Sequence, residues 1–570
     1  MASRNRDSPV VAAIDIGTSY SGYAVQFYED FKKDPIKIFS PQTWNGGKIN
    51  LSSLKTPTCL LLNEKQEIEA FGFQAEDRYA NLCIDKENDK YYFFRRFKMK
   101  LMEGEGLKRT SMIEDETGKK CLALNVFALS IKCLKIHLME MLKKQGTGVE
   151  EEDIFWVLTV PAIWNDAAKQ FMRHAAQKAD IDTEKLAIAL EPEAASIYCH
   201  LLPVDRFTSQ AGKVQFGAAP PGTKYMVVDL GGGTADMTVH EKLGDGKLKE
   251  IWKASGGPWG GTAVDSTFFQ MLISIVGGPV MGRFMKEHTY DYLDLFREFE
   301  SAKRNFSTSS KDKINIKFPV TLNELCEDML GSTFKNCTSE SVHGNDISFV
   351  SDKMRLTPGV LEMLFRKVTY NIIDHIKGIL STGPGRKVSL ILMVGGFSES
   401  QFVQEVIFKE FHGKNGIQII IPRDAGSTVV NGAVLFGRMP SSIESRILRY
   451  TYGKDSCPVF DEKVHPEEKK ITIDGIARCS DVFSFIIAAG TEIKSDFKLR
   501  KSCFTIKKNQ RSMGISFYYS VGKTPMFTTD AGCHLLGTLR IEIPNPSTED
   551  RQVDLTYEFG STELKVTAVE

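Results

Sequence analysis

Short apolar runs alternate with amphipathic stretches over the first two-thirds of the chain. Val10–Ile16 predicts a strand with Ser21–Phe27 as its hairpin partner, and the near-continuous apolar run Ile154–Val160 is typical of a strand buried on both faces. Apolar side chains at helical spacing predict a helix over Asn125–Lys144, and Pro192 suits the first turn of another helix. Strands that alternate with helices indicate the layers of the α/β class.

The same alternation begins again near residue 224. Tyr225–Leu230 predicts a strand, Met237–His240 its partner, and Thr262–Val276 a helix. Later elements of this kind are a strand at Val388–Val394, a helix over Ser398–Phe411, a strand at Ile417–Ile421 and a helix around Thr428–Arg438. The α/β layers are therefore expected to continue to about residue 440.

Helical periodicity fades beyond residue 440. Six short β-like runs follow, with turn residues between them: Phe483–Ala488, Cys503–Lys507, Gly514–Val521, Leu535–Ile543, Val553–Phe559 and Glu563–Val569. This spacing predicts an antiparallel β-sandwich over residues 481–570. Residues 441–480, between the two parts, are expected to form a linker region.

Composition narrows the classes of function. The chain has 570 residues, of which 42% are hydrophobic and 25% charged, as in an ordinary globular protein of several domains. Lys and Arg (72) balance Asp and Glu (72), whereas proteins that grip nucleic acid by its phosphates usually show a basic excess, so no nucleic-acid partner is expected. No run reaches the roughly 20 apolar residues that span a bilayer, so no membrane span is expected.

The eleven cysteines are scattered singly along the chain, without a C-x-x-C pair. They therefore predict neither a zinc ribbon nor a thioredoxin-type motif. An odd number of cysteines in a long chain fits reduced thiols, which indicates a cytoplasmic location, with the nucleus as a second compartment.

One pattern occurs twice. Ala13–Ser19 and Val228–Asp236 are each an apolar strand that carries one Asp and is followed by Gly and then Thr. A second short apolar strand follows each of them. About 215 residues separate the two copies, so the chain is predicted to contain two related halves.

The repeated pattern suits a polyphosphate. Glycine turns let backbone N–H groups approach phosphate oxygens, and the hydroxyls of Thr18 and Thr234 add donors. Asp15 and Asp229, at strand ends, have the oxygen ligands that hold Mg²⁺ through its water shell. Glycine turns after buried strands are common in α/β proteins, so the argument rests on the two copies together. No G-x-x-x-x-G-K-[ST] segment is present, which excludes a P-loop.

Further segments resemble the 70-kilodalton heat-shock proteins of the actin and hexokinase superfamily. Val160–Asp166 resembles their VPAYFND hinge, Leu190–Ala195 resembles NEPTAAA, Glu300–Ser307 resembles the adenosine-contacting ERAKRTLS, and Val394–Ser398 resembles the second adenosine turn VGGSTRIP. These segments cover residues 10–438 in the family's order. Leu535–Leu539 and the last two runs resemble the family's C-terminal strands more faintly. The nearest subtype is the divergent branch called heat shock 70 kDa proteins 12A and 12B.

The resemblance implies an α/β fold: a duplicated, actin-like, two-lobed nucleotide-binding domain over residues 1–440, followed by a β-sandwich without a helical lid. Lobe I would take about 10–205 plus 395–440, and lobe II about 224–394. The cofactors would be ATP or ADP with Mg²⁺. Client proteins or one dedicated protein partner would bind the sandwich, which holds extended peptides in the ordinary chaperones.

The resemblance also implies roles for individual residues. Asp15 and Asp229 would hold hydrated Mg²⁺, while Glu191 and Asp236 would orient the metal shell and the attacking water, with Asp236 the better candidate base. Lys98 matches the family's lysine near the attacked phosphate. Residues expected to contact the nucleotide are Gly17, Thr18, Ser19, Tyr20, Gly231, Gly232, Gly233, Thr234, Gly260, Gly261, Glu300, Lys303, Arg304, Ser307, Gly395, Gly396 and Phe397.

Each of these roles has a plainer alternative. Lys98 sits in a run of four basic residues, and most such runs are solvated surface. Glu191 could be an acidic residue at a helix N-terminus whose charge merely interacts favourably with the helix dipole. Lys303 and Arg304 could lie on an exposed amphipathic helix. The second adenosine turn also departs from the family, with Phe397 and Glu399 in place of Ser and Arg. Losing that Arg costs about 0.5–2 kcal/mol of cation–π binding, unless Phe397 supplies another stacking face.

Three functions follow from this pattern. The leading hypothesis is a chaperone-like switch that binds ATP and hydrolyses it slowly. The second is a non-enzymatic scaffold that keeps a nucleotide as a structural ligand, which the lost Arg and the unrecognisable interdomain linker favour. A small-molecule kinase of the same superfamily is less favoured, because no acceptor-site Asp between the lobes can be named.

Overall fold

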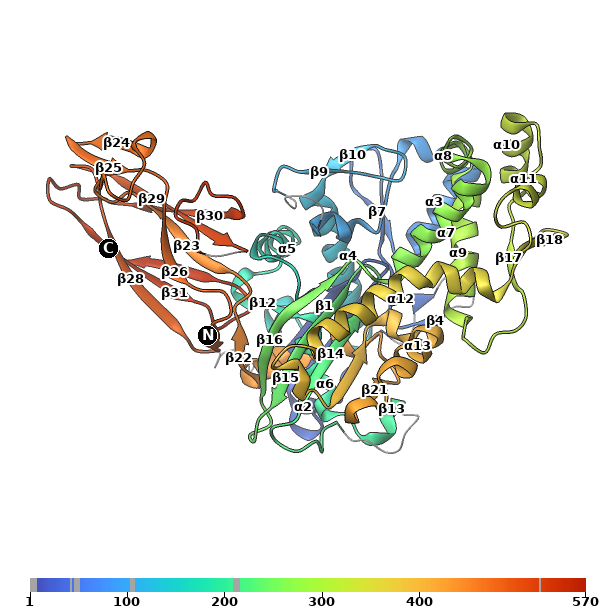
Figure 1. The fold of residues 1–570 in the computed structure, drawn as a ribbon, viewed down its shortest axis with the longest axis horizontal. Coiled ribbons are helices and arrows are strands. Elements are labelled where there is room, and N and C mark those ends of the chain that lie inside the picture. Colours follow the sequence, from blue (N-terminus) through green and yellow to red (C-terminus); the bar gives the residue numbers. More distant parts are fainter. Residues whose placement is uncertain are drawn as a thin grey trace. The chain divides into compact units, whose positions relative to one another are not determined.

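The computed structural model (Figure 1) describes residues 8–41, 44–45, 52–102, 108–208, 216–521 and 524–569. The chain divides into two compact units. The first takes the chain up to Trp164, Ala168–Val239 and Ser255–Pro440, and the second takes Asn165–Ala167, His240–Ala254 and the chain from Ser441 onward. The chain therefore changes unit at residue 440, where its composition changes, but two short earlier segments also belong to the second unit.

The first unit contains a five-stranded sheet in the order β12-β11-β1-β2-β5. Its strands are β1 (Val10–Ile16), β2 (Tyr20–Phe27), β5 (Thr56–Pro57), β11 (Ile154–Val160) and β12 (Leu186–Leu190). β1 is antiparallel to β2 and parallel to β11, which is parallel to β12. Every residue of β1 and β11 is buried, as their continuous apolar runs predict.

A second sheet of this unit repeats part of that plan. It joins, in order, β13 (Phe207–Thr208), β21 (Gln418–Pro422), β20 (Leu390–Val394), β14 (Lys224–Leu230) and β15 (Ala235–Lys242). β20 is parallel to both β14 and β21. Like β1 and β2, β14 and β15 are neighbouring strands joined by a glycine turn, so the internal repeat of the sequence is also a repeat of structure.

Helices follow the strands in both halves of this unit. They are α2 (Tyr28–Lys33), α3 (Phe73–Ile84), α4 (Ala123–Lys144), α5 (Asp166–Lys178), α6 (Glu191–Leu201), α7 (Gly261–Val276), α8 (Gly278–Glu287), α9 (Thr289–Asn305), α10 (Val320–Leu330), α11 (Phe334–Glu340), α12 (Pro358–Leu380), α13 (Gln401–Phe411) and α14 (Thr428–Arg438). The helix expected over Ser398–Phe411 begins later, at Gln401, because a short 3-10 turn, η7 (Gly396–Glu399), precedes it.

The last helix, α14, packs on the first sheet. A Cβ on Gly437 would lie 2.7 Å from Val11 in β1 and 2.9 Å from Val157 in β11. Gly432 lets the backbone of α14 meet that of α6, because a Cβ there would collide with the carbonyl oxygen of Ala194. Of residues 395–440, which the sequence assigns to the first lobe, α14 therefore packs on the first sheet, whereas β21 belongs to the second.

The remaining strands of the first unit are short. They are β3 (Trp44–Asn45), β4 (Ser52–Ser53), β6 (Cys59–Leu62), β7 (Ile68–Phe71), β8 (Tyr92–Arg95), β9 (Met112–Glu114), β10 (Lys120–Leu122), β17 (Ile314–Lys317), β18 (Ile347–Val350) and β19 (Lys353–Leu356). After β8 the chain forms another 3-10 turn, η2 (Phe97–Met102), which carries Lys98 into the interior.

The second unit is built from antiparallel sheets. One has the order β26-β23-β29-β30, with β23 (Thr451–Ser456), β26 (Val482–Ile487), β29 (Ser512–Ser520) and β30 (Cys533–Glu542). Another has the order β28-β31-β32, with β28 (Lys498–Phe504), β31 (Gln552–Glu558) and β32 (Lys565–Val569). Phe517 and Tyr519 of the first sheet share one hydrophobic core with Val553 and Tyr557 of the second.

Residues 441–480, expected as a linker, carry strands of this unit. β23 lies between β26 and β29, and β22 (Ile443–Ile447) pairs with β27 (Glu492–Lys494) and with the start of β16 (Leu248–Gly257). A hairpin of β24 (Lys470–Ile473) and β25 (Ile476–Cys479) completes the range. These strands are short and contain charged residues, so their apolar pattern is too weak to identify them in the sequence.

Candidate functional site

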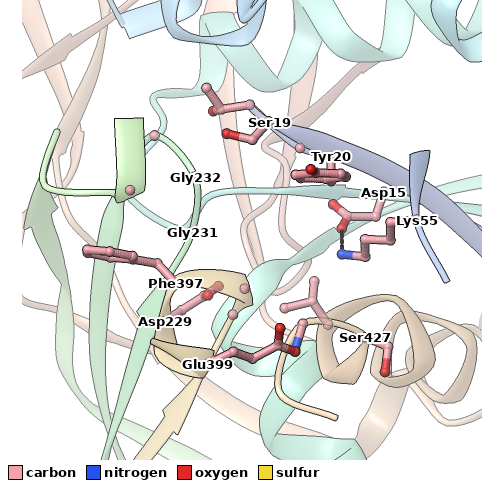
Figure 2. A pocket seen from close by; sticks show the side chains of 18 of the residues that line it. Asp15, Ser19, Tyr20, Lys55, Asp229, Gly231, Gly232, Phe397, Glu399 and Ser427 are labelled. Atoms are coloured by element: carbon pink, nitrogen blue, oxygen red, sulfur yellow. Dashed lines mark hydrogen bonds and ion pairs between the residues drawn. The ribbon is translucent and has the colours of Figure 1, made fainter. Parts of the chain in front are cut away.

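A cavity of about 520 Å³ lies in the first unit, a volume in the usual range for small-molecule sites. Both copies of the strand–Asp–Gly–Thr pattern contribute to its wall (Figure 2). The expected site residues that line it are Asp15, Gly17, Thr18, Ser19, Tyr20, Lys98, Glu191, Asp229, Gly231, Gly232, Gly233, Thr234, Gly261, Glu300, Lys303, Arg304, Gly395, Gly396 and Phe397. Segments separated by up to about 380 residues in the sequence thus meet at one cavity.

The two glycine turns approach each other closely. A Cβ on Gly232 would lie 2.5 Å from the hydroxyl oxygen of Ser19, and a Cβ on Gly233 would lie 2.5 Å from that of Thr18. Glycine at both positions leaves the room in which the two turns meet. The N–H groups of one turn and the hydroxyls of the other can therefore serve one ligand between them.

The second glycine turn rests on the start of α7. Thr262 N–H donates to the Gly232 carbonyl at 2.8 Å, and Gly261 N–H donates to the Gly231 carbonyl at 3.2 Å. Gly260 N–H donates to Gly233 at 3.1 Å, and a Cβ on Gly260 would lie 2.5 Å from the Gly232 carbonyl oxygen. Gly260 therefore supports the turn from behind and is not part of the cavity wall formed by the described residues.

Asp15 is held by two hydrogen-bond donors. Lys55 Nζ lies 2.6 Å from its Oδ2, and the Thr159 hydroxyl donates to its Oδ1 at 2.7 Å. Burial alone would raise the pKa of Asp15, but the ammonium groups of Lys55 and Lys98 outweigh it and lower that pKa below its ordinary value. Asp15 is therefore a carboxylate at neutral pH.

Lys98 and Glu191 form a buried ion pair. Lys98 Nζ lies 2.7 Å from Glu191 Oε1, and the side chains are 5% and 12% exposed. The pair fixes Glu191 at the first turn of α6, so its carboxylate does more than favour a helix dipole. Burial, with Asp15 and Asp236 nearby, raises the pKa of Glu191 to about 7, although Lys98 opposes that rise. The basic run around Lys98 is therefore not wholly solvated surface.

Asp229 has a different environment from Asp15. Its Oδ2 is buried and has no hydrogen-bond partner among the described residues. Burial, and then the nearby carboxylates of Glu191, Asp236 and Asp15, raise the pKa of Asp229 well above its ordinary value. A cation would relieve this concentration of negative charge.

These carboxylates fit hydrated Mg²⁺. In the described part of the chain, no three His, Cys, Asp or Glu residues are arranged to bind a metal directly. Mg²⁺ commonly keeps several of its waters and takes only one or two carboxylates, so a water-mediated site needs no such group. The unpartnered oxygen of Asp229 is the atom that best suits such a shell.

Asp236 lies behind the cavity wall that the described residues form. It is 1% exposed, and its Oδ1 accepts a hydrogen bond from the backbone N–H of Ile163 at 2.9 Å. Its charge still acts on Lys98, Glu191 and Asp229. The structure thus places Asp236 beside the carboxylates, with one of its oxygens bonded to the hinge-like segment that contains Ile163.

A second cluster of charged side chains lies at the C-terminal end of α9. Lys303 Nζ lies 2.6 Å from Asp265 and donates to the Gly261 carbonyl at 3.2 Å, while Arg304 Nε donates to Glu300 at 2.7 Å. The Arg304 guanidinium lies 5.0 Å from the ring centre of Tyr20. Lys303 is buried, so the alternative of an exposed helix face applies only to Arg304, whose side chain is 53% exposed.

Ser307 belongs to a separate small cluster. Its hydroxyl lies 2.9 Å from that of Ser309 and 3.2 Å from that of Ser310. It is not part of the cavity wall formed by the described residues. Its resemblance to the family's adenosine contact therefore remains a prediction.

The turn that resembles the family's second adenosine turn, Val394–Ser398, lies on the wall opposite Tyr20 (Figure 2). Phe397 is 7% exposed, and its ring stacks on that of Phe365 with centroids 6.2 Å apart. Glu399 Oε1 accepts a hydrogen bond from Gly426 N–H at 2.9 Å. The residue that departs from the family thus joins this turn to the next loop.

Sequence reasoning missed several residues of the wall. They are Leu54, Lys55, Ser400, Asp424, Gly426, Ser427 and Val429. Lys55 is a single lysine before a short strand, and no motif around it signals a site. It reaches the cavity because β5 pairs with β2, which carries Tyr20.

The comparisons with known proteins agree with this architecture. The family model for Hsp70 protein matches residues 93–342. Heat shock 70 kDa protein 12B of Homo sapiens is 33% identical over 98% of this chain and 89% of its own length. The chain belongs to the heat shock 70 kDa protein family. Heat shock 70 kDa protein 12A of Mus musculus gives the same identity and coverage, which confirms the expected branch.

Similarity within the heat shock 70 kDa family is uneven along the chain. Chaperone protein DnaK of Thermotoga neapolitana is 27% identical, but over only 71% of this chain and 58% of its own length. The 12A and 12B proteins match nearly the whole chain. The chain is therefore more similar to that branch than to DnaK.

Among the described residues, no single helix has the length and hydropathy to cross a bilayer, and only α7 with α8, bent by 116°, passes as a broken pair.

Proposed function

We propose that this protein binds ATP and hydrolyses it slowly, as a chaperone-like switch. The observation that supports this most strongly is the meeting of the two glycine turns at one cavity, Gly232 against Ser19 and Gly233 against Thr18. Such turns supply backbone N–H groups and hydroxyls to a polyphosphate from two sides. Membership of the heat shock 70 kDa family implies nucleotide binding of this type.

The chain's own groups can do much of the work of phosphoryl transfer, which depends on positioning and neutralised charge. Lys98 would face the attacked phosphate, oriented by its 2.7 Å bond to Glu191. Asp229 would hold the shell of Mg²⁺, which supplies further positive charge to the phosphates. Asp236, oriented by Ile163 N–H, is the candidate to accept the proton of the attacking water.

The second unit would carry the partner site. We infer that its four-stranded sheet, β26-β23-β29-β30, and its three-stranded sheet, β28-β31-β32, form a β-sandwich that binds client proteins or one dedicated protein partner. Large hydrophobic side chains exposed on its strands, such as Phe485 at 43%, Phe504 at 53% and Leu535 at 55%, would suit an extended apolar segment. All eleven cysteines are free, which favours a cytoplasmic or nuclear location.

The path of the chain suggests how nucleotide state would reach this second unit. Residues 165–167 belong to it, and one residue, Trp164, separates them from Ile163, whose N–H is hydrogen-bonded to Asp236. Residues 240–254 belong to it as well, and they continue β15, which begins at Ala235. A change at Asp236 would thus be carried along two covalent connections.

Nucleotide binding and phosphate release test this proposal together. Calorimetry with Mg²⁺ and a multiple-turnover phosphate assay should show binding and slow release for the wild type. Asp236→Asn should lower the rate of phosphate release at least 100-fold with little change in ATP affinity, and Asp229→Asn should lower the rate of phosphate release as well. Asp180→Asn, at an exposed ion pair, is the matched control. Saturating ATP should also alter protease cleavage near residues 440–480, and unchanged cleavage would contradict the switch.

A non-enzymatic scaffold remains the second candidate. Glu399 stands where the family has an adenine-stacking Arg, and Asp15 already has an ammonium partner. Tight ATP binding without multiple turnover, and with no effect of Asp236→Asn, would decide for the scaffold.

A further inference from the structure

Asp15 and Asp229 occupy matching positions in the two copies of the repeat, yet their surroundings are unlike. Both oxygens of Asp15 have partners, Lys55 Nζ at 2.6 Å and the Thr159 hydroxyl at 2.7 Å. Asp229 Oδ2 is buried without one among the described residues. At the position that faces Asp229, the chain has Gly395, where even a Cβ would collide with the carboxylate. The first copy of the repeat thus has a lysine ammonium beside its aspartate, and the second copy has a glycine at the position that faces its aspartate.

Lys55 is held where it is by a short, well-bonded segment. Thr56 and Pro57 pair with Ser21 and Tyr20, and Thr58 N–H donates to the Ser19 carbonyl at 2.9 Å. The Thr58 hydroxyl also donates to the Gly17 carbonyl at 2.8 Å. The backbone next to Lys55 is therefore bonded to the same glycine turn that faces Gly232 and Gly233.

The side chain of Lys55 reaches the carboxylates along a glycine. A Cβ on Gly22 would lie 3.0 Å from Lys55 Cγ, so the aliphatic part of Lys55 passes over Gly22 toward Asp15. The side chain is 18% exposed, and its ammonium group lies in the cavity wall (Figure 2). The four-carbon stem of a lysine can move its charge by several ångströms without moving the backbone.

The charges of the cavity require such a cation. Asp15, Glu191, Asp229 and Asp236 act on one another, and Lys98 already forms an ion pair with Glu191. At the other end of the cavity, Lys303 and Arg304 are paired with Glu300. A polyphosphate would add more negative charge beside Asp15, where Lys55 Nζ lies 2.6 Å from the carboxylate.

We propose that Lys55 is a tethered cation that takes over part of the work of Mg²⁺, so that this chain binds nucleoside polyphosphates with little dependence on free Mg²⁺. Lys55 neutralises Asp15 when the cavity holds no nucleotide and shares its charge with the phosphates when they enter. Because it is covalently attached, its local concentration does not fall when free Mg²⁺ is removed. Asp229 keeps the role toward hydrated Mg²⁺, which would then serve hydrolysis more than binding.

This inference rests on the proposed nucleotide site, and its test separates the two. ATP affinity is measured by calorimetry in excess Mg²⁺ and in excess EDTA, for the wild type, Lys55→Met, Lys55→Arg and the control Lys132→Met. Lys132 forms an exposed ion pair with Asp180 at 2.8 Å. For the wild type, Lys55→Arg and Lys132→Met, the ATP affinity in EDTA should be less than about tenfold below that in Mg²⁺. For Lys55→Met it should be about 100-fold or more below that in Mg²⁺.

Several outcomes would overturn the inference. A wild type whose affinity falls more than 100-fold in EDTA depends on Mg²⁺ in spite of Lys55, and this result needs no variant. If Lys55→Met keeps its melting temperature and its ATP affinity falls by the same factor in Mg²⁺ and in EDTA, Lys55 contacts the nucleotide but does not replace Mg²⁺. A wild type that binds ATP in neither condition would remove the proposed function, and the inference with it.

Discussion

A Cβ atom on Gly232 would lie 2.5 Å from the hydroxyl oxygen of Ser19, although 213 positions separate the two residues in the chain. A Cβ atom on Gly233 would lie equally close, 2.5 Å, to the hydroxyl oxygen of Thr18, which is 215 positions away. The Gly232–Gly233 turn therefore cannot accept a side chain at either position without displacing Ser19 or Thr18 of the other turn. The shape of this end of the cavity therefore depends on both turns together.

The first prediction concerns this approach. Gly232→Ala should lower ATP affinity at least tenfold, equivalent to about 1.4 kcal/mol, because the methyl group pushes Ser19 out of line. Gly282→Ala in α8 is the matched control, since a Cβ there meets nothing within 4 Å. Calorimetry with Mg·ATP measures both, and equal affinities in the two variants would contradict a clamp formed by the turns.

The second prediction concerns the buried pair of Lys98 and Glu191. Lys98→Met leaves Glu191 buried without its partner. Burial already raises the pKa of Glu191 to about 7 and Lys98 opposes that rise, so the carboxyl becomes protonated at neutral pH without Lys98, and the free energy of unfolding should fall by about 1–3 kcal/mol, the cost of a buried polar group that has lost its partner. Replacing Glu191 by Met in the same chain should recover most of that loss, because a packed apolar pair leaves no buried polar group without a partner. Urea unfolding measures all three proteins. Lys120→Met, at an exposed pair with Glu114, should change the stability by less than about 1 kcal/mol.

The third prediction concerns acid unfolding. Burial alone would raise the pKa of Glu300, but Lys303 and Arg304 outweigh it and lower that pKa to about 2. The ionised carboxylate therefore stabilises the folded chain above its ordinary pKa near 4.3, and this contribution is lost as pH falls from about 4.3 toward 2.

Glu300→Gln should remove that contribution. The side chain is 29% exposed, so solvent screening reduces the expected loss at neutral pH to about 1–2 kcal/mol. The free energy of unfolding, measured with urea at pH 7 and at pH 3, should differ less between the two pH values for Glu300→Gln than for the wild type. Glu298→Gln, at an exposed site on the same helix, should keep the wild-type difference.

The fourth prediction concerns the aromatic ring that replaces a serine of the family. If Phe397 stacks on the nucleoside, Phe397→Ser should weaken ATP binding about 3–10-fold and leave tripolyphosphate binding unchanged. The ring also packs on Phe365, so the melting temperature is recorded, and Phe397→Leu separates lost packing from lost stacking. Equal loss for ATP and tripolyphosphate would argue against a nucleoside contact.

Much of the fold follows from local patterns. The strand Ile154–Val160 and the helix Thr428–Arg438 have the predicted bounds, and both are mostly apolar segments that are almost wholly buried. The repeated Asp–Gly–Thr pattern also placed both glycine turns in one site. A short motif predicts well when the chemistry depends on backbone geometry that only glycine permits.

Other features depend on contacts between distant segments. Nothing in the sequence near Lys55 shows that β5 will pair with β2 and bring its ammonium to Asp15. β23 is a six-residue strand with two charged residues, and it becomes recognisable only between β26 and β29. Register and pairing are decided by tertiary packing, which a single sequence does not display.

The three passages of the chain into the second unit bear on how that unit can be isolated. β22 takes part of its pairing from residues 248–249, which lie about 190 positions earlier. A fragment that starts at Ser441 would leave one side of β22 as an open edge, and unpaired edges invite association with other strands. A protein cut at residue 440 should therefore yield a C-terminal fragment that associates through this edge, whereas a fragment in which a linker joins residues 240–254 to residues 441–569 should keep that edge of β22 paired.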